Sequence, residues 1–313
     1  MKTTSLSDQQ TERTTSTVLV GAIGFAMGSA DLVPGVSGGT VALVAGIYER
    51  LVASIRMGAG ALASLLRLDV AGALAGLRRV EWRFLVPLLG GILVAIFSLA
   101  GLLHTALDEH PELLAAGFFG LVLASTVVAV EELRQPTATH LGAGLATAIA
   151  VFLLLGLHGG SVDDLSVPVA FAGGALAVCA MILPGVSGSF LLLLVGLYDG
   201  VISAVDDRDL VIVGAVALGA AVGLGLFSTA LHWVLRRHHD MVLALMLGLM
   251  VGSLRVLWPW PAGEEGVGDT ALGAPTGDWW WAIAVAAAAY GLVVVLARAA
   301  RRRTVAPAAA PTG

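Results

Sequence analysis

The chain has 313 residues, of which 58% are hydrophobic and only 12% are charged, and its formal net charge is −5. Soluble globular proteins carry about 25% charged residues, so this composition excludes a water-soluble domain and favours an all-α polytopic membrane protein. The single cysteine, Cys179, excludes an intramolecular disulfide and a metal cluster built on several cysteines. We predict no resident metal or cofactor, and we leave the oligomeric state open.

Apolar stretches follow a polar N-terminus at residues 1–16, which we expect to be disordered. About 20 residues at 1.5 Å each cross a hydrocarbon core of about 30 Å. In chain order, we predict a hairpin at 17–55, spans at 84–107 and 113–130, a linking span at 141–157, a second hairpin at 168–205, spans at 210–235 and 241–258, a final span at 279–298 and a tail at 299–313.

Connectors rich in Arg alternate with connectors that contain neither Lys nor Arg. The Arg-rich set comprises 56–83, 131–140, 236–240 and the tail, and the other set comprises 108–112, 158–167 and 259–278. Arg-rich loops face the cytoplasm, so both termini are predicted to be cytoplasmic in a multi-pass protein of the plasma (inner) membrane. Arg208 in the 206–210 connector is a mild exception. Stretch 56–83 is predicted to form a helix lying on the cytoplasmic surface.

This alternation requires 17–55 and 168–205 each to return to the side from which they start. After Ser37 and Ser187, the apolar runs reach Tyr48-Glu49-Arg50 and Tyr198-Asp199 within roughly 17–20 Å at 1.5 Å per residue. In a full span, Glu49 and Arg50 would lie inside hydrocarbon at a cost of about 2.5–3.5 kcal/mol each. We therefore favour re-entrant hairpins over pairs of full spans.

In such hairpins, Tyr48, Glu49, Tyr198 and Asp199 lie at the membrane interfaces. All four residues are candidates for coupling or gating, and the two carboxylates are alternatively expected to pair with Arg50 and Arg208.

The pentapeptide PGVSG occurs at 34–38 and again 150 positions later at 184–188. The register holds at Leu43/Leu193, Gly46/Gly196 and Tyr48/Tyr198, and with a spacing of 128 it continues at Gly120/Gly248 and Ser125/Ser253. We therefore predict two copies of one unit, at 17–135 and 168–258. An odd number of crossings separates them, so they form an inverted-topology repeat, which is typical of secondary transporters with a midplane binding site.

Pro and Gly break the helix at each tip, and broken backbone is tolerated at membrane depth only where protein buries it or a wet cavity adjoins it. The restarted helices begin with free N–H groups, a positive dipole end and a serine, a combination that suits phosphate or carboxylate. The alternative is that the small residues only permit tight packing. The candidate binding residues are Pro34, Gly35, Ser37, Gly38, Gly39 and Thr40 at the first tip and Pro184, Gly185, Ser187, Gly188 and Ser189 at the second.

The tips DLVPGVSGGT and LPGVSGSF, with GLMVGSLRVLWPW at 248–260, resemble the polyprenyl-phosphate transporter family of bacteria and archaea. The resemblance covers roughly residues 18–260. It implies two opposed re-entrant hairpins and a non-enzymatic carrier, or flippase. Such a carrier returns undecaprenyl phosphate, or an archaeal polyprenyl phosphate, from the outer to the cytoplasmic leaflet for reuse in envelope synthesis, including peptidoglycan. The expected partners are that lipid and the bilayer, with no nucleic acid.

Three other residues are candidates with an alternative reading. Arg255, near the predicted outer interface, is expected to contact phosphate or to snorkel outward as an anchor. Asp31, three residues before the first tip, is expected to bind a coupling H⁺ or Na⁺, to pair with Arg255, or to cap the restarted helix. His232 is a candidate proton relay, or else a packed histidine.

Two rival functions are considered. A membrane polyprenyl-pyrophosphate phosphatase has similar tips, but that family has an Arg directly after the tip serine and a Glu-x-x-x-Glu pair. Gly38 and Gly188 follow the serines here, and the sequence contains no such pair of glutamates. A small-anion or solute carrier with the same architecture stays open.

Overall fold

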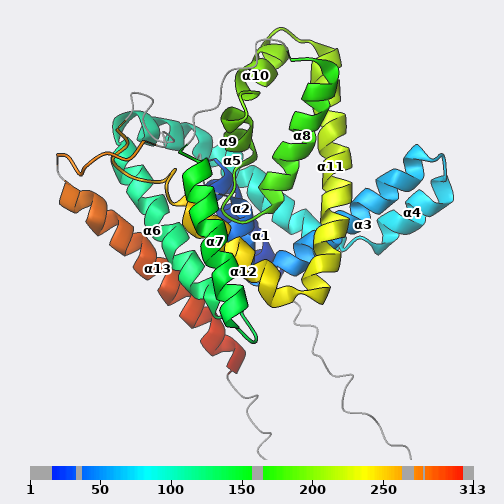
Figure 1. The fold of residues 1–313 in the computed structure, drawn as a ribbon. Coiled ribbons are helices and arrows are strands. Elements are labelled where there is room, and N and C mark those ends of the chain that lie inside the picture. Colours follow the sequence, from blue (N-terminus) through cyan, green and yellow to red (C-terminus); the bar gives the residue numbers. More distant parts are fainter. Residues whose placement is uncertain (1–15, 33–36, 157–164, 263–270, 278, 306–313) are drawn as a thin grey trace, which may run out of the picture.

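The computed structural model describes residues 16–32, 37–156, 165–262, 271–277 and 279–305, so the predictions for residues 1–15, Pro34 and Gly35 lie outside the described residues. The described residues form thirteen helices (Figure 1). They are α1 (Thr17–Asp31), α2 (Gly38–Val44), α3 (Tyr48–Leu66), α4 (Val70–Arg79), α5 (Trp82–Glu109), α6 (Pro111–Val130), α7 (Ala138–Leu154), α8 (Val167–Ile182), α9 (Gly188–Leu194), α10 (Tyr198–Asp206), α11 (Leu210–Arg237), α12 (His239–Ser253) and α13 (Trp279–Val305).

Three helices are long and apolar enough to cross a membrane, and they cover the predicted spans 84–107, 113–130 and 210–235. The other three predicted spans fall on α7, α12 and α13, which are shorter apolar helices or, in α13, carry a shorter apolar part. Span 241–258 is predicted too long, because α12 ends at Ser253 and residues 254–257 form a turn. Pro259 disfavours helical backbone in the residue before it. The all-α, multi-pass character expected from the composition is confirmed.

The trailing arm of each predicted hairpin consists of two helices rather than one. A seven-residue helix, α2 or α9, ends at a glycine with positive φ, which is 69° at Gly46 and 71° at Gly196. The amide of the next residue then donates to a carbonyl five positions back, at 3.0 Å in the first arm and 2.8 Å in the second. Glycine is favoured at this helix-ending position because it lacks a Cβ. The sequence match between Gly46 and Gly196 therefore reflects the same turn in both halves.

Stretch 56–83 is not the single surface helix that the sequence suggests. α3 continues to Leu66, the backbone turns at Leu68 with a φ of 61°, and α4 folds back along α3. The carboxylate of Asp69 accepts the amide of Gly72 at 2.8 Å and so caps α4. This α3–α4 hairpin has no counterpart between α10 and α11, which explains why the repeat spacing falls from 150 to 128.

Glycines allow the helices of each half to pack with close backbone contact. α1 lies along α5, and α8 lies along α11. A Cβ added at any of four glycines would collide with backbone of the partner helix. These are Gly24 against Leu88 and Gly91 against Gly21 in the first pair, and Gly174 against Val216 and Gly219 against Phe171 in the second. Gly24 and Gly174 are 150 positions apart and Gly91 and Gly219 are 128 apart, so the packing follows the sequence repeat.

The two halves also exchange a helix. α6 packs along α13, where Gly120 contacts Ala286, and α12 packs along α7, where Gly248 contacts Gly144. The helix that follows each half therefore pairs with the other half.

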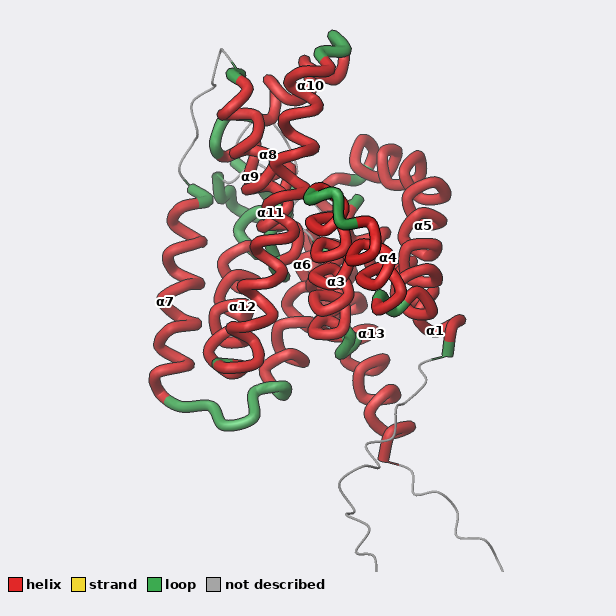
Figure 2. The backbone as a smooth tube through the Cα atoms, turned by 90° about the vertical axis from the view of Figure 1, so that its right-hand side faces the viewer, coloured by secondary structure: helices red, strands yellow, loops and turns green. Residues whose placement is uncertain are grey.

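Connections alternate between the two ends of the bundle. The α6–α7 and α11–α12 connections lie at the end where α13 finishes, and the α5–α6 and α10–α11 connections lie at the opposite end (Figures 1 and 2). α8 runs from that opposite end toward the middle of the molecule, and α9 and α10 return toward it (Figure 1).

The close glycine packing gives a direct test of the fold. We expect Gly219→Leu to destabilise the protein by about 1–3 kcal/mol, because the side chain would enter space filled by the Phe171 backbone. Thermal unfolding of the purified protein in detergent measures the effect. Gly214→Leu is the matched control on the same helix, since Gly214 is exposed and its added Cβ would meet open space. Equal melting temperatures for the two variants would contradict the α8–α11 packing.

Candidate functional site

The described part of the first tip, which begins at Ser37, lies in contact with the start of the second tip. Three hydroxyl groups of the first half bind the backbone of residues 181–185, which form the start of the second tip. Ser37 donates to the Leu183 carbonyl at 3.3 Å or the Met181 carbonyl at 3.4 Å, Thr40 accepts the Gly185 amide at 2.9 Å, and Tyr48 donates to the Ile182 carbonyl at 2.9 Å. All three side chains are buried, and Thr40 is fully inaccessible. Because buried polar groups require partners, these bonds fix the position of one tip relative to the other.

The amides of Gly38 and Gly39 at the first tip have hydrogen-bond acceptors within the protein. The Gly38 amide donates to the Asp31 carboxylate at 2.6 Å, and the Gly39 amide donates to the Ser37 hydroxyl at 3.1 Å. Of the roles considered for Asp31, capping of the restarted helix is the one seen here. A Cβ on Gly39 would lie 3.0 Å from the Ile182 carbonyl oxygen, so its small size permits the contact between the tips.

The second tip differs from the first at its polar groups. Met181 occupies the place of Asp31, and Ser187 makes no side-chain bond that caps α9. The Ser187 and Ser189 hydroxyls lie 2.9 Å apart and bond to each other. Ser187 is only partly buried and Ser189 is exposed. The second tip therefore presents two hydroxyl groups that are not used to hold the protein together.

Small residues fit the rest of the second tip into the bundle. Pro184 and Gly185 are buried, and Gly185 has a φ of 82°. A Cβ on Gly185 would lie 2.7 Å from the Met250 Cα, and one on Gly188 would lie 2.6 Å from the Ala177 carbonyl oxygen. The packing role of small residues thus holds for these two glycines, alongside any role in binding.

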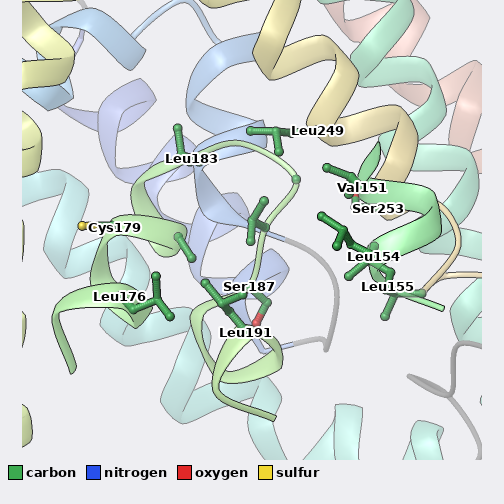
Figure 3. Close-up of a pocket in the computed structure, with 14 residues that line it drawn as sticks. Val151, Leu154, Leu155, Leu176, Cys179, Leu183, Ser187, Leu191, Leu249 and Ser253 are labelled. Carbon is green, nitrogen blue, oxygen red and sulfur yellow. The ribbon is translucent and has the colours of Figure 1, made fainter. Parts of the chain in front are cut away.

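An apolar cavity of about 270 Å³ adjoins the second tip, between α7, α8, α9 and α12 (Figure 3). Its wall is formed mainly by aliphatic side chains, such as Val151, Leu154, Leu176 and Leu191, and Ser187 is one of its lining residues. Ser253 also contributes, but its hydroxyl donates to the Met250 carbonyl at 2.9 Å. Ligand sites are typically concave and apolar with a few placed polar groups, and this cavity has that character.

Arg255 lies next to this cavity, at the end of α7. One guanidinium nitrogen donates to the Phe152 carbonyl at 3.0 Å, and the guanidinium carbon is 4.8 Å from the centre of the Phe152 ring. The same group lies so close to Gly156 that a Cβ there would collide with it. Val256, the next residue, lines the cavity. Arg255 is thus anchored to α7 beside the cavity wall.

The remaining predicted residues lie away from the tips or contact other groups. Glu49 pairs with His239 at 3.2 Å, and Arg50 pairs with Glu81 at 2.6 Å. Tyr198 is partly buried beside a small cluster around Leu197, Asp199 is exposed, and His232 lines a separate cavity near the end of α11.

Helix α7 contributes to the cavity although the sequence assigns 141–157 only a linking role. Val151, Leu154 and Leu155 are apolar residues in an apolar helix. Nothing in their pattern distinguishes a cavity wall from a surface that faces lipid.

The restarted helices are seven residues long. A helix this short contributes little of the dipole that a long helix would offer, so the polar groups at the second tip are chiefly the Ser187 and Ser189 hydroxyls.

The family model described as undecaprenyl phosphate translocase-like matches residues 27–271. The chain is 42% identical over 241 residues to a polyprenyl-phosphate transporter of Vibrio cholerae, covering 76% of each chain. It is 31% identical over 253 residues to a polyprenyl-phosphate transporter of Staphylococcus aureus, covering 75% of this chain and 84% of that one.

No solved structure matches this chain. The matched region contains both tips, the apolar cavity and Arg255. The resemblance seen in the tip motifs is therefore confirmed over most of the sequence, and the chain belongs to the undecaprenyl phosphate translocase-like family.

Proposed function

We propose that this protein carries polyprenyl phosphate from the outer to the cytoplasmic leaflet of the plasma membrane, so that the lipid can be reused in envelope synthesis. Family membership and the names of the two relatives support this substrate. The observation that carries the proposal is the apolar cavity that adjoins the second tip and has Ser187 among its lining residues, since the substrate joins a hydrocarbon chain to a small anionic group.

The cavity favours a lipid over a small soluble anion. Its lining is almost wholly aliphatic, and α7 and α8, which form two of its sides, are both apolar helices. Isoprenoid hydrocarbon gains free energy by contacting such a surface. A small anion would lose hydration there without matching hydrogen bonds. A phosphatase role gains no support from the tips, where glycines follow both serines.

An inverted repeat with two re-entrant hairpins fits this role. Both halves contain the same order of a long helix, a seven-residue helix and a turn at glycine, and both use glycines at matching positions for close packing. The chain direction of α8, α9 and α10 supports a hairpin that returns to its own side (Figure 1). With the Arg-rich ends in the cytoplasm, the second hairpin starts from the outside.

The unequal tips fit one state of an alternating cycle. The first tip is closed by its own bonds to Asp31 and to the second tip, whereas Ser187 adjoins an open cavity. If the second hairpin starts outside, this arrangement corresponds to a state that accepts lipid from the outer leaflet. Repeats related by inverted symmetry can exchange such roles during transport.

The Ser187 hydroxyl provides a test of substrate binding. We expect Ser187→Ala to slow return of polyprenyl phosphate by about tenfold or more, because a hydrogen bond to a charged group contributes about 1.5–3 kcal/mol. The measurement is the outer-leaflet pool of polyprenyl phosphate in cells that depend on the variant. The pool should rise toward the level in cells lacking the protein.

Ser98→Ala is the control, because Ser98 is exposed on α5 and bonds only to its own helix. Adding Ser37→Ala tests the contact between tips as well. Full rescue by the Ser37/Ser187 double variant would exclude the tips as the lipid-phosphate site.

Ion coupling at Asp31 forms a second prediction. Asp31→Asn keeps an acceptor for the Gly38 amide but removes the negative charge. If H⁺ or Na⁺ binds the carboxylate, transport in proteoliposomes should lose its response to an imposed gradient of that ion while the protein stays folded. The assay is lipid flipping with and without each gradient.

Asp69→Asn is the matched control, since Asp69 also caps a helix start but lies on the α3–α4 hairpin. An Asp31→Asn protein that still responds to the gradient as the wild type does would leave Asp31 with the capping role alone.

A further inference from the structure

A second cavity, of about 370 Å³, lies between α3 and the end of α11 and is basic in character. Its lining residues are Arg56, His232, Trp233, Arg236 and Arg237. None of them lines the apolar cavity at the second tip. Four of the five lining residues lie near the end of α11, where α11 turns into α12 (Figure 1).

Helix geometry brings these residues together from distant parts of the sequence. α3 packs on α11, and an added Cβ on Gly225 would lie 3.3 Å from the Ala59 Cβ, so the two helices are in contact at these residues. Arg56 lies about one turn before Ala59 on α3. His232 and Arg236 lie about two and three turns after Gly225 on the same face of α11. The basic residues of the two helices thus line one cavity.

The arginines of this cavity are not neutralised by the protein. Within the described part of the chain, no carboxylate lies within 4.0 Å of Arg56, Arg236 or Arg237. Arg50, one helical turn from the group, does have such a partner in Glu81. His232 experiences the positive charges of Arg56 and Arg236 and the negative charge of Glu49. The Glu49 carboxylate itself pairs with His239. The cavity therefore keeps a strong net positive charge.

We propose that this basic cavity binds a dianionic phosphate group, and that it receives the phosphate of the lipid at the cytoplasmic end of its passage. The delivery of the lipid phosphate to this cavity rests on the proposed transport function. A phosphate monoester carries about −1.5 to −2 charges at pH 7, which suits three guanidinium groups. One guanidinium group can also donate two parallel hydrogen bonds to two oxygens of the same phosphate. Trp233 is 61% exposed, and tryptophan is enriched where a membrane meets water. A lipid headgroup can reach such a place while its chain stays in the bilayer.

Ordinary membrane anchoring gives the competing explanation. Arginines in the last turn of a helix interact favourably with the negative end of the helix dipole, and they hold that helix end on the cytoplasmic side of the membrane. Neither effect requires a bound ligand. The chain contains a matched pair for this comparison, because Arg78 and Arg79 end α4 as Arg236 and Arg237 end α11. The α4 pair lines neither cavity.

Site-specific crosslinking tests the proposal. The full-length protein carries Trp233→p-benzoylphenylalanine and is placed in nanodiscs of phosphatidylcholine with a radiolabelled short-chain isoprenyl monophosphate. We expect saturable crosslinking that falls about tenfold on Arg236→Gln/Arg237→Gln. The control Arg78→Gln/Arg79→Gln removes the same charge from a corresponding helix end, and its crosslinking should stay within about twofold of the parent.

Competition identifies the source of the phosphate group. Displacement by unlabelled isoprenyl monophosphate, with little displacement by inorganic phosphate, assigns the site to the lipid. Equal displacement by inorganic phosphate assigns it to free phosphate. Equal displacement by phosphatidylglycerol, equal loss in both arginine variants, or no saturable crosslinking would overturn the proposal.

These outcomes are separate from those for transport itself. Ser187→Ala tests lipid movement between leaflets without touching the basic cavity. If that variant blocks transport but the arginine pair does not affect crosslinking, the transport function stands and the basic site fails. If crosslinking depends on the arginine pair while transport is absent, a phosphate site remains without the proposed function.

Discussion

The contact between the two helix-breaking tips is the constraint on which the rest of the site depends. Ser37, Thr40 and Tyr48 use their hydroxyls to satisfy backbone groups of the second tip, in a place from which bulk water is excluded. Each bond matters because an unsatisfied buried polar group costs about 1–3 kcal/mol. The bonds also make the halves unequal, since the first tip is used to hold the second and the second keeps Ser187 available. A rearrangement that opened the first tip would have to replace these bonds.

Close helix packing supplies the frame around that contact. Glycines let α1 approach α5 and α8 approach α11 until backbone meets backbone, as is common where small residues line membrane helices. The exchange of α7 and α13 between the halves then ties each half to the other. The α3–α4 hairpin adds an extension to one half only, and α3 carries Arg56 into the basic cavity.

Sequence patterns predicted much of this architecture, because apolar length and helix-breaking residues act on the segment that contains them. Apolar length indicated membrane helices, and the repeated PGVSG with Gly46 and Gly196 indicated two copies of a broken helix. Those signals arise from helix-breaking residues and from the cost of placing charge in hydrocarbon, both of which act within a short segment. Helix ends were less predictable, as the turn after Ser253 and the fold-back at Leu68 show.

By itself, the sequence determined the membrane class, the repeat and the positions of the tips, because composition, breakers and charge act along the chain. Only the tertiary structure decided which hydroxyls are occupied, since Ser37 and Ser187 stand in the same motif and differ in their surroundings. It also decided that α7 walls the apolar cavity and that Arg56 joins Arg236 and Arg237. These outcomes depend on contacts between residues far apart in sequence. Such contacts follow from how whole helices pack, and an apolar or basic residue carries no local sign of the partner it will meet.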